Sequence, residues 1–307
     1  MRPTLTIALS LCAGCTEYDY AEYREHQTWD QASDIAAADV LFVVDNSASM
    51  SEEQARLGDN FAAFVDVVSD TFADFQLGVV TTDVDGAEAG VLRGGIMTSD
   101  DTDLGASFLT AIDVGTSGSR DERGFAAAFL AAAHPQNAGF VREGARFNIV
   151  IFSDEDDHTP QSVDEVMEII DNLKGDGDYA FHGVIGDLPD GCASGAGAAD
   201  AGMRYEQAIA RSGGFQQSIC SDDYSDLLTK VGLDVAGLTD TFLLDEVPEP
   251  DSIEVRVDTV LMHQRAIDGW RYSPGENALV FDGRSVPRPG MQVTATYGLL
   301  LGGQNTP

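Results

Sequence analysis

Short apolar runs alternate with segments of helical periodicity over the first two thirds of the chain. Val40–Val44 and Phe147–Phe152 are apolar at nearly every position, which is typical of strands buried on both faces of a sheet. Further strands are predicted at Phe75–Thr81, Tyr179–Ile185 and Phe215–Ile219. Between the strands, apolar residues recur every three or four positions, which predicts helices at Ser51–Phe72, Glu122–Ala133, Gln161–Leu173, Ala199–Ala210 and Asp222–Leu233. This alternation predicts an α/β fold, with a mainly parallel sheet covered by helices on both faces.

The apolar pattern changes to a period of two after about Thr239. Alternating segments occur at Ile253–Val257, Leu279–Phe281 and Gln292–Tyr297, and Pro- and Gly-containing turns separate them. Such alternation is typical of antiparallel strands with one face in water. We therefore predict a domain boundary near residue 238 and a small antiparallel β module over residues 239–307.

The first 15 residues have the pattern of a short signal peptide. Arg2 precedes an apolar stretch from Leu5 to Leu11, and small residues lead to Cys15. The ending resembles a bacterial lipobox, which implies that Cys15 is lipidated and anchors an exported lipoprotein to a membrane of the cell envelope. Ordinary secretion and a cytosolic chain with an apolar start are the alternatives. Residues 16–36 are polar and lack periodicity, so we expect a tether between membrane and domain.

The chain has four cysteines. Cleavage of the signal peptide removes Cys12, and lipidation uses Cys15, so Cys192 and Cys220 remain. Two cysteines in an exported protein predict one disulfide, and two buried thiols are the alternative.

The charge of the chain is strongly negative. It carries 52 acidic and 17 basic residues, for a formal net charge of −35. A surface of this kind repels nucleic acid and anionic lipid headgroups, so both are excluded as direct partners. The acidity serves either solubility, including adaptation to salt, or the binding of cations by some of the carboxylates.

Oxygen-bearing side chains follow the two fully apolar strands. Asp45, Ser47 and Ser49 come directly after the first strand at alternate positions, and Asp154 comes two residues after the second. Carboxylate and hydroxyl oxygens are the ligands that hard cations such as Mg²⁺ prefer, and so small a set leaves coordination positions open. The alternative is that Ser49 or Ser51 only caps the following helix.

Asp-x-Ser-x-Ser after an apolar strand, a later Thr-bearing loop and an Asp after another apolar strand resemble the von Willebrand factor type A domain and its metal-ion-dependent adhesion site. The resemblance covers residues 37–238 and implies a Rossmann-like, doubly wound sheet. It also implies a bound divalent cation, with Mg²⁺ favoured over Mn²⁺ and Ca²⁺, whose coordination a partner's carboxylate often completes. Asp45, Ser47, Ser49 and Asp154 match the motif. For the middle ligand we expect Thr116, and Ser119, Asp121 and Glu122 are competing candidates.

The remaining motifs do not indicate catalysis. The chain lacks G-x-S-x-G, H-E-x-x-H and P-loop signatures, and its five histidines are scattered singly. We expect Asp156 and Asp157 to lie in a solvated acidic turn. The sequence therefore predicts a non-enzymatic, metal-dependent adhesion protein whose partner is a protein or peptide with an exposed carboxylate. The alternative is an envelope scaffold in which the cation is purely structural.

Overall fold

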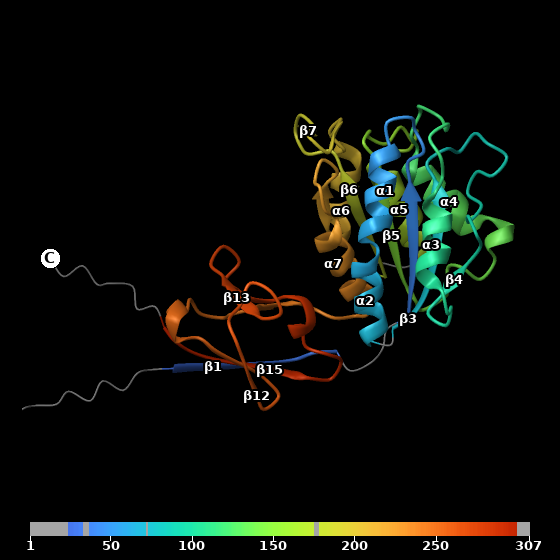
Figure 1. The fold of residues 1–307 in the computed structure, drawn as a ribbon. Helices are drawn as coiled ribbons and strands as arrows, with labels where there is room; N and C mark the ends of the chain where they lie inside the picture. Colours follow the sequence, from blue (N-terminus) through green and yellow to red (C-terminus); the bar gives the residue numbers. More distant parts are fainter. Residues whose placement is uncertain (1–23, 33–36, 72, 175–177, 300–307) are drawn as a thin grey trace, which may run out of the picture.

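The computed structural model describes residues 24–32, 37–71, 73–174 and 178–299. They form an α/β part and a smaller β part, which Figure 1 shows with the elements labelled. The signal-peptide and lipidation predictions, Cys15 included, lie outside the described residues, as do residues 16–23 and 33–36 of the expected tether. Within the described ranges, no helix is long and apolar enough to cross a membrane.

The α/β part is built on a six-stranded sheet with the order β4-β3-β2-β5-β6-β9. Its strands are β2 (Ala37–Val44), β3 (Asp74–Thr81), β4 (Met97–Thr98), β5 (Arg146–Phe152), β6 (Tyr179–Ile185) and β9 (Gln216–Ser218). All neighbours pair in parallel except β4, which lies antiparallel at the edge. Val44 pairs with Phe152, so β2 and β5 end side by side.

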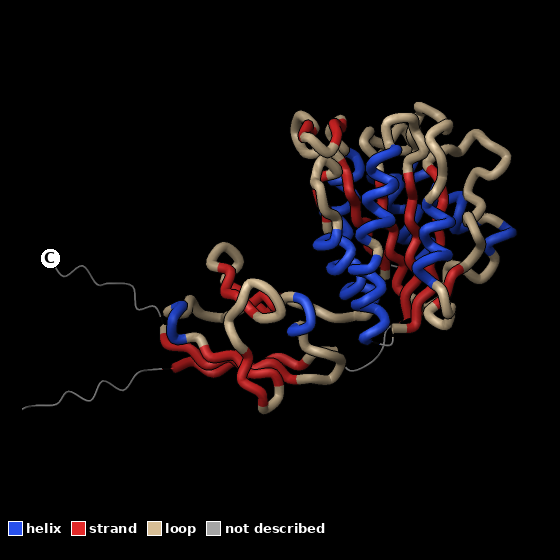
Figure 2. The backbone as a smooth tube through the Cα atoms, viewed as in Figure 1, coloured by secondary structure: helices blue, strands red, loops and turns tan. Residues whose placement is uncertain are grey.

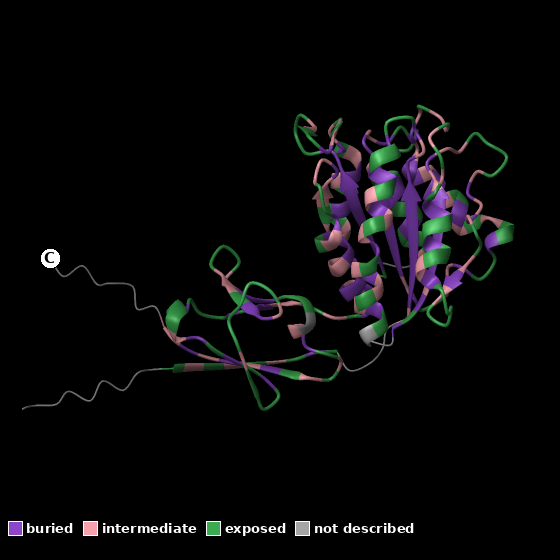
Figure 3. Ribbon diagram, in the orientation of Figure 1, coloured by how far each residue is buried: buried purple, intermediate pink, exposed green. Residues whose placement is uncertain are grey.

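Helices cover both faces of this sheet, and the strands between them are buried (Figure 3). One face packs against α1 (Ser51–Asn60), α2 (Ala62–Thr71), α3 (Leu104–Ile112) and α7 (Ser225–Val235). The other packs against α4 (Gly124–Ala133), α5 (Val163–Lys174) and α6 (Met203–Ser212). The single-turn 3-10 helices are η1 (Pro135–Asn137), η2 (Pro250–Ser252) and η3 (Gly283–Ser285). The predicted α/β class is thus confirmed.

Three elements differ from the sequence prediction. The predicted long first helix is interrupted at Phe61, which separates α1 from α2, and the apolar segment that forms α3 was not predicted. The sixth helix starts at Met203, later than predicted, because the preceding Gly- and Ala-rich residues form the hairpin β7 (Cys192–Ser194) and β8 (Gly197–Ala199). Figure 1 shows β7 at the end of the sheet where the parallel strands terminate.

The β part consists of two antiparallel sheets, which Figure 2 shows apart from the helical layers. One has the order β1-β15-β11-β12 and the other β10-β14-β13. Their strands are β1 (Arg24–Asp30), β10 (Thr241–Leu243), β11 (Glu254–Val257), β12 (Val260–Met262), β13 (Trp270–Ser273), β14 (Ala278–Phe281) and β15 (Gln292–Gly298). A separate apolar cluster, with Phe242, Trp270 and Phe281 among its members, lies between them.

The first strand corrects the tether prediction. Residues 24–30 lie within the segment that we expected to be an unstructured tether, yet they form β1 and pair along their whole length with β15. Trp29 packs against Phe242, with 5.7 Å between the ring centroids. The β module is therefore completed by a strand from the other end of the chain.

Candidate functional site

The predicted site residues lie where β2 and β5 end. After β2 the chain adds β3 on one side of it, and it later adds β5 on the other side. The strand order therefore changes direction between β2 and β5, which is a topological switch point of the sheet. Open α/β sheets bind ligands outside the carboxyl ends of the strands at such a point. The backbone N–H of Asp45 donates to the carbonyl of Phe152 at 2.8 Å, which holds the two strand ends together.

Asp45 is fully buried at the end of β2. Its Oδ1 accepts a hydrogen bond from the backbone N–H of Ser47 at 2.7 Å, and its Oδ2 accepts one from the Ser153 hydroxyl at 2.7 Å. The first bond folds the loop back on itself, so that Ser47 and Ser49 are presented on the same side as the carboxylate. Both carboxylate oxygens are thus oriented by the loops that follow β2 and β5.

The structure brings the four motif residues together. The hydroxyls of Ser47 and Ser49 lie 3.1 Å apart, and Ser49 hydrogen-bonds to the carboxylate of Asp154. Asp154 is also close enough for its charge to raise the pKa of Asp45. Oδ1 of Asp154 is buried and has no hydrogen-bond partner. The arrangement offers carboxylate and hydroxyl oxygens in one place, with one oxygen still to be satisfied.

The loop between α3 and α4 contacts the Asp45 loop mainly through its backbone. The N–H of Gly118 donates to the carbonyl of Asn46 at 2.9 Å, and a Cβ on Gly118 would meet Asn46 Oδ1 at 2.1 Å. The side chain of Gln54 bridges the two loops, because its Nε2 donates to the carbonyls of Asp45 and Gly115 at 2.9 and 3.0 Å. A side chain at position 118 would therefore displace the side chain of Asn46, and the two bonds of Gln54 fix the spacing of the loops.

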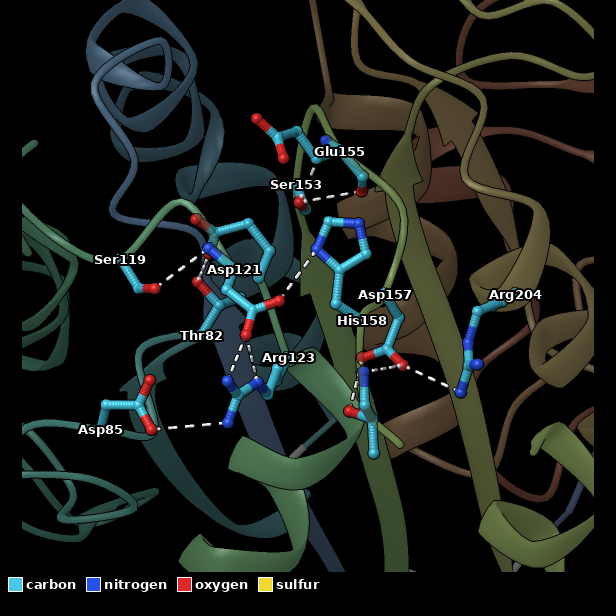
Figure 4. Close-up of polar contacts among 12 residues, drawn as sticks. Thr82, Asp85, Ser119, Asp121, Arg123, Ser153, Glu155, Asp157, His158 and Arg204 are labelled. Carbon is cyan, nitrogen blue, oxygen red and sulfur yellow. Dashed lines mark hydrogen bonds and ion pairs between the residues drawn. The ribbon is translucent and has the colours of Figure 1, made fainter. Parts of the chain in front are cut away.

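The four candidates for the middle ligand have different surroundings. Thr116 is half-buried and lines a hollow between α1 and α3. The hydroxyl of Ser119 accepts a hydrogen bond from the N–H of Asp121, and the carboxylate of Asp121 faces Arg123 and His158 (Figure 4). Among the four, only Glu122 has its carboxyl in hydrogen-bonding contact with Asp45. The structure therefore places the carboxyl of Glu122 in contact with Asp45.

Glu122 is completely buried just before α4. Its Oε2 accepts a hydrogen bond from the hydroxyl of Thr82, and its Oε1 has no partner. Burial and the nearby charge of Asp45 raise the pKa of Glu122 to about 8. A second buried carboxyl thus presents a free oxygen at the same strand ends.

The nearby basic side chains bind other carboxylates. Figure 4 shows Arg123 and His158 directed at Asp121, and Arg204 directed at Asp157. The corresponding ion pairs have N···O distances of 3.3 Å for His158 and 3.2 Å for Arg204. Among the described residues, Asp45, Glu122 and Asp154 form no ion pair with a basic side chain. These three carboxyls therefore have no protein cation to compensate them.

Asp157 does not lie in a solvated turn, which corrects the sequence prediction. Its side chain is fully buried, and its Oδ1 accepts the N–H of Phe125 at 3.1 Å in the first turn of α4. The hydroxyl of Thr159 accepts the N–H of Ala126 beside it. Asp157 thus caps α4 from a distant segment, which satisfies the unpaired N–H groups at the helix start. No local pattern could reveal this role, because 32 residues separate the donor from the acceptor.

Burial makes the charged forms of the site carboxyls costly. Burial raises the pKa values of both Asp45 and Asp154, because the charged carboxylates lose their hydration. Buried charges in proteins are normally paired or coordinate a metal. Among the described residues, no three His, Cys, Asp or Glu side chains gather closely enough to hold one metal ion.

The hairpin β7–β8 lies near the loop that carries Asp154. A disulfide joins Cys192 to Cys220, which confirms the predicted pairing. Arg56 of α1 donates to the carbonyls of Ala196 and Ser221, and it also pairs with Glu53. The N–H of Asp200 donates to the carbonyl of Asp154 at 2.8 Å. The hairpin is thus attached both to α1 and to the loop that carries Asp154.

Comparison with solved structures finds two pilus adhesins and a byssus matrix protein among the similar chains. The pilus adhesin SpaC from Lactobacillus rhamnosus GG matches with a TM-score of 0.52 at 10% identity, over 90% of this chain and 41% of SpaC. Proximal thread matrix protein 1 from the mussel byssus, with a zinc-occupied MIDAS motif, matches at 0.38 with 17% identity, over 69% of this chain and 47% of that protein. The pilus adhesin RrgA from Streptococcus pneumoniae matches with a TM-score of 0.37 at 10% identity, over 91% of this chain and 59% of RrgA.

These matches concern the fold alone, and the chain spans about two fifths of the length of SpaC. No family model matches the sequence, and no curated protein matches it. The fold and the site together define the class: an α/β protein with buried carboxyl and hydroxyl groups at the carboxyl edge of its sheet.

Proposed function

We propose that this chain is an exported binding protein of von Willebrand factor A type that attaches to its partner through a divalent cation. Asp45, Ser47, Ser49 and Asp154 would hold the ion, with Mg²⁺ as the first candidate and Mn²⁺ or Ca²⁺ as alternatives. A carboxylate on a protein or peptide partner would complete the coordination. The likeness to the fold of SpaC is consistent with an adhesive role.

One observation carries this proposal: buried carboxyls meet at the strand ends without a basic partner. Asp154 Oδ1 and Glu122 Oε1 are buried and unpaired, and ionising either carboxyl in this state without a cation is costly. A divalent cation would compensate both Asp45 and Asp154, and the hydroxyls of Ser47 and Ser49 add oxygens suited to Mg²⁺. The open side of the ion would then accept an oxygen from the partner.

The proposed location is the cell envelope. The disulfide between Cys192 and Cys220 is of the kind that persists in oxidising compartments. Lipidation of Cys15 would anchor the chain, and the acidic surface would keep the domain itself away from anionic headgroups. Labelling with radioactive palmitate, compared between the natural chain and Cys15→Ala, tests the anchor.

Replacement of Asp45 by Ala tests the metal site. The variant should lose Mg²⁺ and Mn²⁺ binding in calorimetric titration, because it removes the carboxylate that orients Ser47. Its far-UV circular dichroism should be unchanged, since β2 stays buried. Partners captured from envelope extracts by the natural chain should be released by EDTA and absent with the variant. Retention of metal binding by Asp45→Ala, or capture insensitive to EDTA, contradicts the proposal.

A scaffold whose cation is purely structural is the second candidate. It is favoured by the way the site joins separate loops, through the bonds from Gly118 to Asn46 and from Asp200 to Asp154. In that case EDTA would lower the melting temperature strongly, and no carboxylate-bearing partner would be recovered. An adhesion site would show the opposite balance, with a small thermal shift and a cation-dependent partner.

A further inference from the structure

We infer that Glu122 is the third-loop ligand of the cation, in the position where the sequence pattern suggested the hydroxyl of Thr116. This inference rests on the proposed metal site and names one more residue of its coordination shell. It gives the site a charged oxygen where a neutral hydroxyl was expected. The cation would accordingly be held more tightly than the Asp-x-Ser-x-Ser motif alone implies.

The placement of Glu122 supports a ligand better than a structural side chain. Its carboxyl is fully buried and touches Asp45, yet its Oε1 has no hydrogen-bond donor. Two buried carboxyls in contact cannot both be charged unless a positive charge lies between or beside them, and otherwise one of them takes up a proton. The basic side chains nearby, Arg123, His158 and Arg204, are all paired with Asp121 or Asp157.

Glu122 is also held in place from two sides. The hydroxyl of Thr82 at the end of β3 donates to its Oε2, which leaves Oε1 as the free oxygen. Its backbone carbonyl accepts the N–H of His158 at 2.7 Å, which ties it to the loop that carries Asp154. Metal ligands are commonly oriented by such outer contacts. Thr116, by contrast, lines the hollow between α1 and α3.

The resulting shell combines two carboxyls and two hydroxyls. Asp45 and Glu122 would provide the carboxyl oxygens, Ser47 and Ser49 the hydroxyls, and Asp154 would act through a bound water. This division agrees with the absence, among the described residues, of any three carboxylate, imidazole or thiol side chains gathered closely enough for one metal. Mg²⁺ and Mn²⁺ accept such mixed oxygen shells and retain waters.

Titration of the full chain with Mn²⁺, followed by electron paramagnetic resonance of free and bound ion, tests the assignment. Glu122→Gln keeps the shape of the side chain and removes its charge, so the Kd for Mn²⁺ should rise by at least about tenfold. Thr116→Val, which removes only the hydroxyl, is the matched control and should bind Mn²⁺ as the natural chain does. Folding is checked by circular dichroism in EDTA.

Each outcome has a distinct meaning. Unchanged affinity in Glu122→Gln, or a loss confined to Thr116→Val, overturns the assignment while leaving the metal site intact. If Asp45→Ala also binds Mn²⁺ normally, the proposed function itself fails. Should Glu122→Gln not fold, Glu122→Asp retains the charge with a shorter reach. That variant should weaken binding and alter the spectrum of bound Mn²⁺, and an unchanged Kd and spectrum overturns the assignment.

Discussion

His182 lies in the interior of β6 and is fully buried, although it is a titratable residue. Its Nδ1 accepts the backbone N–H of Phe215 at 3.1 Å, so the ring proton is assigned to Nε2, which faces Asn148 Oδ1 at 3.1 Å. Burial lowers the pKa of His182 to about 4, because the imidazolium cannot be hydrated there. The neutral tautomer is therefore part of the packing between β5, β6 and β9.

This histidine predicts a loss of stability in mild acid. Its pKa is about 4 when folded and about 6.5 when unfolded, so protons bind preferentially to the unfolded chain. The free energy of unfolding should fall as the pH drops from 6.5 towards 4, by roughly 3 kcal/mol from this residue. Urea titrations at pH 7 and 4.5 measure the change, and His182→Gln should show a smaller one. An equal pH dependence in both chains would contradict the assignment.

The Asp45 loop shows how one element serves both the fold and the site. Gln54, in the second turn of α1, holds the carbonyls of Asp45 and Gly115 together. Asp157 caps α4 and thereby fixes where Glu122 stands before the helix. The site thus depends on helix ends that are secured by residues from other segments, and not on the motif loop alone.

The hairpin β7–β8 depends on contacts with other segments of the chain. It is two short strands rich in Gly and Ala, packed through Arg56 and closed by the disulfide. In the chain-entropy model, a loop with a sequence separation of 28 contributes about 3.5 kcal/mol. We expect the double variant Cys192→Ser/Cys220→Ser to lose up to this amount of unfolding free energy.

Guanidinium unfolding of the double variant, with the natural chain as reference, measures this loss. Hydrogen exchange should show the largest increase at the hairpin and around Asp200, which donates to Asp154. The amides of β2 and β5 should remain protected, since those strands are buried in the centre of the sheet. Uniform loss of protection over the whole sheet would indicate that the disulfide supports the entire domain instead.

At the scale of the whole molecule, the two ends of the described chain build one module. β1 precedes the α/β part and β15 follows it, yet they pair over seven residues. Gln31 strengthens the join, because its Nε2 donates to the carbonyls of Thr239 and Pro287 at 2.8 and 3.0 Å. The α/β part is consequently inserted between two strands of the same sheet.

Replacing Trp29 tests this join. Trp29 is half-buried against Phe242, and Trp29→Ala should lower the unfolding free energy of the β module by about 2 kcal/mol, less than for a fully buried aromatic. Thr28→Ala, on the exposed face of the same strand, is the matched control and should change little. Differential scanning calorimetry should show the loss in the module's transition. A loss of similar size in both variants would contradict the packing role.

The sequence by itself determined the alternation of strands and helices, the change of period near residue 238 and the paired cysteines. These depend on local spacing of apolar residues and on composition, which a single chain displays directly. It also predicted that Asp45, Ser47, Ser49 and Asp154 lie close together, because residues that end adjacent parallel strands must meet at the same edge of a sheet.

Only the tertiary structure decided that Arg24–Asp30 is a strand, that Asp157 caps a distant helix and that Glu122 stands beside Asp45. Each of these depends on a partner far away in the sequence. The backbone N–H and C=O groups of β1 find their hydrogen-bond partners in β15. The polar sequence of β1 alternates too weakly to predict a strand without that partner. The contact of Glu122 depends on where α4 begins, which is set by a carboxylate from another loop. Local periodicity carries no information about such long-range pairing.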